Sequence, residues 1–195
     1  MDEGYIKFSC NWIEAGPLPI DQLFEINRWR DNLYKLGYIG VYDNGVGFGN
    51  ISIRFKALTF IITGSATGGL KILNENHYVM VNEYNLRKNS IKCTGPIIAS
   101  SESLSHAVIY ECSNETNAVI HIHNFDIWEK LIHKVPTTRK EISYGTPGMA
   151  TEIKRLFKQT NVGTDKIIAM AGHKEGIIVF GKTLDEAGQI LLKNS

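Results

Sequence analysis

Residues 117–123, Asn-Ala-Val-Ile-His-Ile-His, constrain the fold more than any other segment of the chain. The apolar residues of this segment are mostly β-branched, which favours a β-strand over a helix. Successive side chains of a strand point to opposite faces, so His121 and His123 share one face and Ile122 points to the other. The chain is therefore expected to form a sheet in which one strand face carries two imidazoles.

His121 and His123 could chelate one divalent metal ion together. A His-x-His pair alone is equally compatible with two imidazoles at a strand edge that make ordinary hydrogen bonds. A third ligand has to come from elsewhere, and His173, in Met-Ala-Gly-His-Lys-Glu-Gly at residues 170–176, is the candidate. Three nitrogen ligands leave coordination positions open, as in catalytic rather than structural metal sites.

Composition restricts the class of protein. The 195 residues, 43% hydrophobic and 21% charged, are typical of a soluble globular protein and fit a single domain, residues 1–195. A formal net charge of +1 offers no basic surface for nucleic acid. No apolar run approaches the ~20 residues that a membrane span needs, and the N-terminus lacks the apolar segment of a signal peptide. Three scattered cysteines without a Cys-x-x-Cys pair predict reduced thiols in a cytoplasmic protein.

Strand-type and helix-type segments alternate along the chain. Strands are expected at residues 47–55, 58–63, 77–82, 117–123, 166–171 and 175–180. Helices are expected from Pro19 to about Gly37, from Ser100 to Cys112, at 126–133, from Thr146 to about Phe157, and after Thr183. Short loops between the strands predict a sheet with substantial antiparallel content that helices cover on both faces.

Small residues gather in three segments that suit a phosphate group. The loop Gly-Ser-Ala-Thr-Gly-Gly at residues 64–69 supplies backbone N–H groups and short hydroxyls. Ser100 and Ser101 begin a predicted helix, where free N–H groups and the helix dipole favour an anion. Asn50 follows a Gly-x-Gly sequence and could donate through its amide. Each segment alone is an ordinary turn or helix cap, but their joint occurrence beside candidate metal histidines indicates a phosphorylated ligand.

Glu102 lies in the first turn of the same predicted helix. Acidic residues are common there for structural reasons, and a carboxylate beside a metal can also act as a general base. A base removes a carbon-bound proton well only where the resulting negative charge is stabilised, which a divalent metal can do as a Lewis acid. Phosphate loops, metal and carboxylate together describe enolisation of a phosphorylated ketose or triose. His106, one helical turn after Glu102, is expected to orient that carboxylate or to pack in the core.

In these segments the chain resembles the class II aldolase/adducin family, the zinc-dependent sugar-phosphate aldolases and their relatives. The matching segments are residues 49–52 (Gly-Asn-Ile-Ser), 60–68 (Phe-Ile-Ile-Thr-Gly-Ser-Ala-Thr-Gly), 100–102 (Ser-Ser-Glu), 117–123, 144–147 (Tyr-Gly-Thr-Pro) and 171–181, which begins Ala-Gly-His. They occur in the family's order and span most of the chain from about residue 40 onward.

The resemblance implies a three-layer α/β/α sandwich with a mainly antiparallel central sheet, and a cyclic homotetramer. It implies Zn²⁺, or another divalent transition metal, bound by His121, His123 and His173, with Glu102 as the acid/base. It also implies a phosphate site, which is made by Asn50, Ser65, Thr67, Gly68, Ser100 and Ser101.

The activity that follows is that of a metal-dependent lyase on a small phosphorylated sugar. It would cleave or form a ketose 1-phosphate through a metal-stabilised enediolate of dihydroxyacetone phosphate. Three alternatives stay open. A dehydratase of a ketose 1-phosphate, such as the methylthioribulose 1-phosphate branch, uses the same metal and glutamate. A ribulose-phosphate epimerase resembles this site with aspartate in place of Glu102. A non-catalytic adducin-like binding or assembly domain resembles this chain without the metal histidines.

Overall fold

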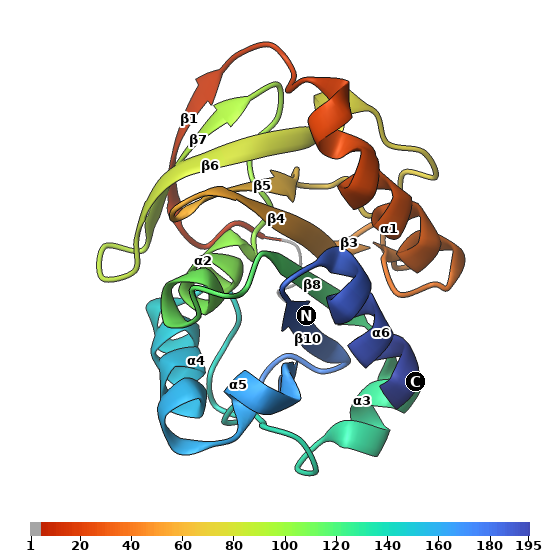
Figure 1. Ribbon diagram of the computed structural model, residues 1–195, viewed down its shortest axis with the longest axis vertical. Coiled ribbons are helices and arrows are strands. Elements are labelled where there is room, and N and C mark those ends of the chain that lie inside the picture. The colour runs from red at the N-terminus through yellow and green to blue at the C-terminus, as the bar shows by residue number, and fades with distance from the viewer. Residues whose placement is uncertain (1–4) are drawn as a thin grey trace.

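A computed structural model describes residues 5–195 and is built around one eight-stranded sheet (Figure 1). The strands of this sheet are β1 (Ser9–Glu14), β4 (Asn50–Lys56), β5 (Thr59–Thr63), β6 (Tyr78–Asn85), β7 (Ser90–Gly95), β8 (Ala118–His123), β9 (Ile167–Ala169) and β10 (Gly176–Gly181). Their order across the sheet is β1-β7-β6-β5-β4-β8-β10-β9. Strands β2 (Gly40–Val41) and β3 (Gly47–Phe48) form a separate antiparallel ribbon.

The main sheet is mixed. Strand β1 pairs with β7 in parallel, whereas each of the other neighbouring pairs is antiparallel. No strand was expected from the sequence at residues 9–14 or 90–95, so neither strand of this parallel pair was predicted. A signal was present, because Ile6, Phe8, Cys10 and Trp12 alternate with polar residues in the sequence. The residues of β7 alternate as well, with Ile91 and Cys93 buried.

Helices cover both faces of the sheet. They are α1 (Phe24–Lys35), α2 (Ser103–Cys112), α3 (Phe125–Leu131), α4 (Pro147–Gln159), α5 (Val162–Asp165) and α6 (Leu184–Asn194), with short 3₁₀ turns η1 (Ile20–Leu23) and η2 (Glu75–His77). Helices α2, α4 and α5 lie on one side of the sheet, and α1, α3 and α6 lie on the other (Figure 1). The side chains of the first group form one apolar core with the sheet, and those of the second group form another. A mixed α/β fold with helices on both faces is therefore observed.

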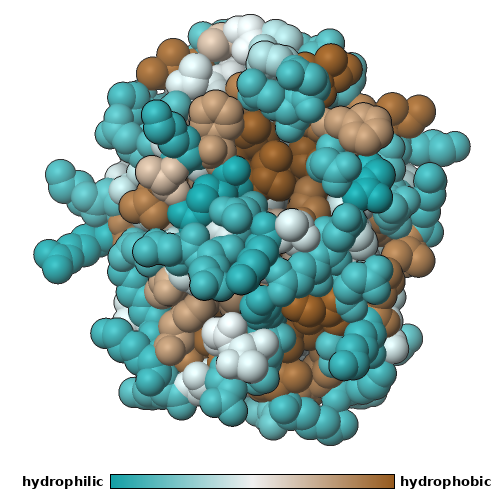
Figure 2. All heavy atoms as spheres, in the orientation of Figure 1, coloured by the Kyte–Doolittle hydropathy of each residue, from teal (hydrophilic) through white to brown (hydrophobic). Residues whose placement is uncertain are grey.

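Local signals determine where several helices begin. Thr146 accepts a hydrogen bond from the backbone N–H of Met149, and Pro147 occupies the first turn of α4, as the sequence predicts. Thr183 accepts in the same way from Glu186 at the start of α6. Within residues 5–195 no helix combines the length and the apolar character that crossing a bilayer requires. The face in Figure 2 is mainly hydrophilic, with apolar side chains gathered in separate patches.

Strand β8 is an interior strand of the sheet, between β4 and β10, and all of its residues are buried. Ile120 and Ile122 pack into the core that contains α1 and α6. The two histidines of β8 therefore point to the opposite face. The sheet register places His121 beside Asn50 of β4 and His123 beside Gly176 of β10.

Candidate functional site

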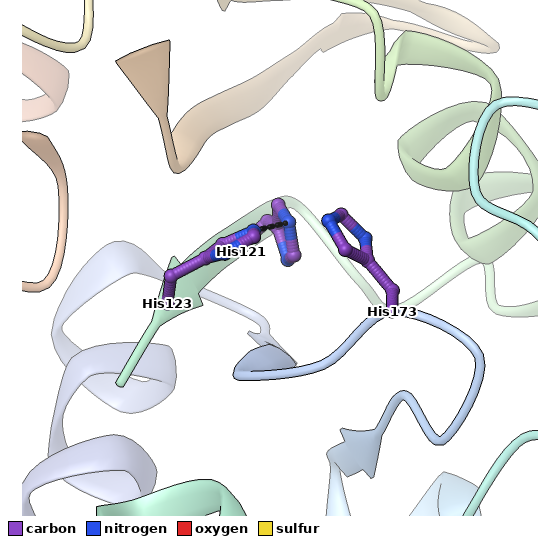
Figure 3. A group of neighbouring side chains, drawn as sticks. All are labelled: His121, His123 and His173. Carbon is purple, nitrogen blue, oxygen red and sulfur yellow. Dashed lines mark hydrogen bonds between the residues drawn. The ribbon is translucent and has the colours of Figure 1, made fainter. Parts of the chain in front are cut away.

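Three imidazoles meet at the end of β8. His121 and His123 come from the strand, and His173 comes from the loop between β9 and β10 (Figure 3). One ring nitrogen from each histidine lies within 4.8 Å of the others, and all three side chains are buried. The three histidines singled out in the sequence are thus brought together from segments about 50 residues apart along the chain.

Hydrogen bonds determine which nitrogens face the centre of this cluster. The Nδ1 atom of His121 lies 3.1 Å from the carbonyl oxygen of Ile177, which can only accept, so Nδ1 carries the proton. The Nδ1 atom of His123 lies 2.7 Å from the hydroxyl of Tyr42, and that hydroxyl donates to the carboxylate of Glu175 at 3.1 Å. The Tyr42 oxygen therefore accepts the Nδ1 proton of His123. In both neutral imidazoles, Nε2 is left with its lone pair.

The two Nε2 atoms lie 3.0 Å apart. Lone pairs that face each other at this distance repel unless a cation or a proton lies between them. Burial, followed by the neighbouring imidazoles, lowers the pKa of both His121 and His123 well below its usual value, which disfavours a proton there. Two nitrogens bound to one tetrahedral Zn²⁺ at about 2.05 Å would lie roughly 3.3 Å apart. The donor set therefore fits a divalent metal ion.

Glu102 lies beside the third histidine. It occupies the N-cap position of α2 and is 2% exposed. One carboxylate oxygen accepts a hydrogen bond from the Ser105 hydroxyl at 2.6 Å, and the other lies 3.6 Å from Nδ1 of His173. The ring of Tyr144 stacks on His173, with centroids 4.4 Å apart. A buried, oriented carboxylate thus lies at the edge of the histidine cluster.

His106 does not contact this carboxylate by a hydrogen bond. Its Nδ1 atom bonds to the hydroxyl of Ser52 at 2.7 Å, and that hydroxyl also bonds to Tyr110 at 2.8 Å. Complete burial lowers the pKa of His106 to about 3, so the ring is neutral. Of the two roles expected from the sequence, packing in the core is the one that the contacts support.

All of the site residues expected from the sequence line one pocket. The lining comprises Asn50, Ser65, Thr67, Gly68, Ser100, Ser101, Glu102, His121, His123 and His173, together with Gly47, Phe48, Gly49, Gly64, Ala66 and Tyr144. The side-chain oxygen of Asn50 is buried there without a partner among the described residues. Within residues 5–195, no acceptor is bonded to the backbone N–H groups of Ala66, Gly68 and Gly69. Unused polar groups in a pocket indicate a ligand.

Residues 41–192 match the family described as Class II Aldolase and Adducin N-terminal domain. The chain belongs to this class II aldolase and adducin family. The match covers the histidine cluster, Glu102 and the small-residue loops.

Several solved structures share the fold. An L-fuculose 1-phosphate aldolase has a TM-score of 0.68 at 18% identity, over 91% of this chain and 82% of the other. The L-fuculose-1-phosphate aldolase of Thermus thermophilus has a TM-score of 0.57 at 21% identity, over 86% and 90%. A sugar-phosphate aldolase of Thermotoga maritima has a TM-score of 0.64 at 16% identity, over 89% and 90%. Among the curated proteins, none matches the chain.

Arg30 supports the pocket from outside the region that matches the class II aldolase family. It lies on α1, is 1% exposed, and donates to the carbonyl oxygens of Thr67 at 3.0 Å, Gly68 at 3.1 Å and Lys71 at 3.3 Å, and also to that of Leu70. A trans peptide is planar, so a carbonyl that points toward Arg30 directs the next N–H group the opposite way. Arg30 therefore orients the loop that lines the pocket.

Arg30 was not expected in the site, although the sequence carries a signal for its burial. The buried face of α1 consists of Ile26, Trp29, Arg30 and Leu33, at helical spacings of three and four. A charged residue on an otherwise apolar helix face needs a buried partner. Here the partners are loop carbonyls about 40 residues away along the chain, which no local pattern identifies.

Proposed function

We propose that this member of the class II aldolase family is a metal-dependent lyase that cleaves or forms a ketose 1-phosphate. The observation that carries the proposal is the pair of inward Nε2 atoms of His121 and His123, 3.0 Å apart, in a pocket shared with His173 and Glu102. The named aldolases with the same fold act on sugar phosphates, which supports this substrate class.

His121, His123 and His173 would hold the metal ion, Zn²⁺ or another divalent transition metal. When bound, such an ion supplies Lewis acidity toward the carbonyl and hydroxyl oxygens of the sugar. The chain itself prepares the ligands, because Ile177 and Tyr42 occupy the Nδ1 atoms of the two strand histidines. Their Nε2 lone pairs are thereby directed into the pocket before any ligand arrives.

The phosphate group would bind where small residues line the pocket. Ser100 and Ser101 precede α2, whose first N–H groups and dipole favour an anion. The amide of Asn50 and the loop with Ser65, Thr67 and Gly68 would complete the phosphate site, with unbonded N–H groups nearby. Anchoring the phosphate there places the carbonyl end of the sugar toward the histidines.

Glu102 would move the proton. In the direction of synthesis its carboxylate removes a proton from the carbon beside the carbonyl of dihydroxyacetone phosphate. In the direction of cleavage the same carboxyl group returns the proton and releases that product. The hydrogen bond from Ser105 orients the carboxylate, and burial keeps water away from it.

The first experiment measures metal content by elemental analysis of untagged wild-type protein and of His121→Ala. About one divalent ion per chain in the wild type and none in the variant supports the metal site. Wild-type protein that binds no metal after reconstitution would overturn the lyase and favour a binding domain on an enzyme fold. The same samples, measured by light scattering, test the proposed homotetramer against the chain mass of 21.9 kDa.

The second experiment tests Glu102→Gln. Proton exchange of dihydroxyacetone phosphate in D₂O, followed by NMR, should fall by a factor of about 10²–10⁴ while the metal content stays at the wild-type level. Unchanged exchange would remove Glu102 from the proposed role. Product analysis of wild-type turnover then separates lyase from dehydratase, because a dehydratase forms a new carbonyl without breaking a carbon–carbon bond.

A further inference from the structure

Two side chains lie behind His123, outside the lining of the pocket. Tyr42 follows β2 in the two-stranded ribbon, and Glu175 follows His173 in the loop before β10. The Tyr42 hydroxyl lies 2.7 Å from Nδ1 of His123 and 3.1 Å from a carboxylate oxygen of Glu175. The ribbon, the strand and the loop thus meet at one hydroxyl group.

The carboxylate of Glu175 determines which groups donate and which accept in this chain of hydrogen bonds. An ionised carboxylate can only accept, so the Tyr42 hydroxyl donates to Glu175 and its oxygen accepts from His123. A negative charge at the end of such a chain makes Nε2 of the imidazole a stronger donor toward a metal and holds the orientation of the ring. The loop that carries His173 therefore also influences His123.

The backbone of Glu175 supports a role for its side chain. Its φ angle is +72°, in the left-handed region that glycine adopts readily and other residues adopt at a cost in free energy. A residue in such a conformation persists where its surroundings hold it, and functional sites are common places for it. At position 175 the backbone alone would favour glycine, whereas glutamate brings a carboxylate to Tyr42.

We propose that Tyr42 and Glu175 are positioning residues that orient His123 and strengthen its bond to a divalent metal. The inference rests on the proposed metal site. A purely structural role is the competing explanation, because Tyr42 also packs on Phe48, with ring centroids 4.5 Å apart, and so holds the ribbon in place.

The test uses Zn²⁺ alone, titrated into metal-free protein in competition with a chromophoric chelator. Tyr42→Phe keeps the ring and removes the hydroxyl, and is expected to weaken Zn²⁺ affinity about 10–100-fold. Glu175→Gln keeps an acceptor but removes the charge, so its loss should be smaller. Tyr84→Phe and Glu129→Gln are the controls and should bind as the wild type does. The Tyr84 hydroxyl has no hydrogen-bond partner among residues 5–195, and Glu129 is exposed.

Glu175→Gly separates positioning from structure. Glycine relieves the left-handed backbone while removing the carboxylate, so the metal-free variant should unfold at or above the wild-type temperature and still bind Zn²⁺ about 10–100-fold more weakly. Loss of stability and affinity together in Glu175→Gly would favour the structural explanation. If folded Tyr42→Phe and Glu175→Gly bind Zn²⁺ within twofold of the wild-type affinity, the inference about Tyr42 and Glu175 is overturned, and the proposed metal site is not. Wild-type protein without Zn²⁺ binding would overturn the metal site, and the inference with it.

Discussion

At the scale of single residues, the geometry of the candidate site depends on acceptors that bond to Nδ1 of His121 and His123. The carbonyl of Ile177 that bonds to His121 belongs to β10, and strand pairing sets its position opposite Ile122. The sheet therefore determines the tautomer of one histidine, and a hydroxyl from the ribbon determines that of the other. Because a metal binds only a deprotonated nitrogen, these hydrogen bonds would leave Nε2 of both histidines available to the proposed metal ion.

Arg30 also supports the pocket without lining it, through its hydrogen bonds to loop carbonyls. Replacing it by Met keeps most of the volume but leaves the carbonyls of Thr67 and Gly68 without their donor. We expect Arg30→Met to lower the free energy of unfolding by about 2–3 kcal/mol in urea denaturation, because buried acceptors lose a charged partner. Inorganic phosphate, titrated by ³¹P NMR, should bind more weakly because the loop is no longer held.

The control for this prediction is the neighbouring Arg28. Its side chain is 43% exposed and pairs with Glu25 and Asp185 on the surface. Arg28→Met should therefore change stability by no more than about 0.5 kcal/mol and leave phosphate binding unchanged. Equal phosphate affinity of folded Arg30→Met and wild type would show that the loop keeps its shape without Arg30.

At the scale of elements, α1 packs on α6 as well as on the sheet. The ring of Trp29 lies against Gly188 of α6, and its indole N–H donates to Asp185 at 2.7 Å. A methyl group at position 188 would overlap that ring. Because α1 also carries Arg30, a shift of α1 on α6 would move Arg30 and the pocket-lining loop to which it bonds.

Gly188→Ala tests this packing. Alanine favours a helix over glycine by about 1 kcal/mol, but the overlap with Trp29 should outweigh this gain. We expect a net loss of about 1–3 kcal/mol in the free energy of unfolding. Gly163→Ala in α5 is the matched control, since a methyl group there meets no atom within 4 Å, and it should be neutral or stabilising. A Gly188→Ala protein as stable as the control would mean that α1 shifts without cost.

Glu152 of α4 accepts a hydrogen bond from the backbone of Arg139 and so joins this helix to the segment that precedes it. This carboxylate is 3% exposed and accepts from Arg155 at 2.6 and 3.0 Å and from the backbone N–H of Arg139 at 2.9 Å. The hydrogen bonds from Arg155 lower the pKa of Glu152 below its usual 4.5. A carboxyl group whose pKa is lowered by folding stabilises the protein above its usual pKa, and this contribution is lost as the pH falls through the folded value.

Glu152→Gln should therefore destabilise the protein in a pH-dependent way. At pH 7 we expect a loss of about 2 kcal/mol in the free energy of unfolding, since a charged hydrogen-bond acceptor is removed. The gap between variant and wild type should narrow as the pH falls below about 4.5, where the unfolded chain begins to protonate. Chemical denaturation from pH 3 to pH 7 measures this gap, and the exposed Glu129→Gln is the control. A gap independent of pH would show that the charge of Glu152 contributes nothing.

At the scale of the whole molecule, the sequence predicted features that depend on neighbouring residues better than contacts between distant segments. The shared face of His121 and His123 follows from strand periodicity alone, and the start of α4 follows from Thr146 and Pro147. Strands β1 and β7 were not predicted although apolar and polar residues alternate in both. Their parallel pairing, which makes the sheet mixed, joins segments about 80 residues apart, and no local pattern identifies such a partner. The partners of Arg30 could not be predicted, because the carbonyls of a loop acquire their direction only in the folded chain.

The proposed metal site joins distant parts of the chain, because His121 belongs to β8 and His173 to the loop after β9. An ion that binds only the folded protein adds about 2.7 kcal/mol of stability at a free concentration 100 times its Kd. For a chain of this length that corresponds to roughly 5–11 °C in unfolding temperature. We expect Zn²⁺ to raise the melting temperature of metal-free wild type by this amount and EDTA to reverse the change.

His121→Ala should show no such response to Zn²⁺, whereas His133→Asn should respond as the wild type does. His133 is exposed, is not part of the histidine cluster, and has a φ angle of +63°, a conformation that asparagine tolerates. A response that persists in His121→Ala would place the stabilising ion elsewhere. If the melting temperature of the wild-type protein does not respond to Zn²⁺, then the histidine cluster holds no metal. The fold would then serve binding rather than catalysis.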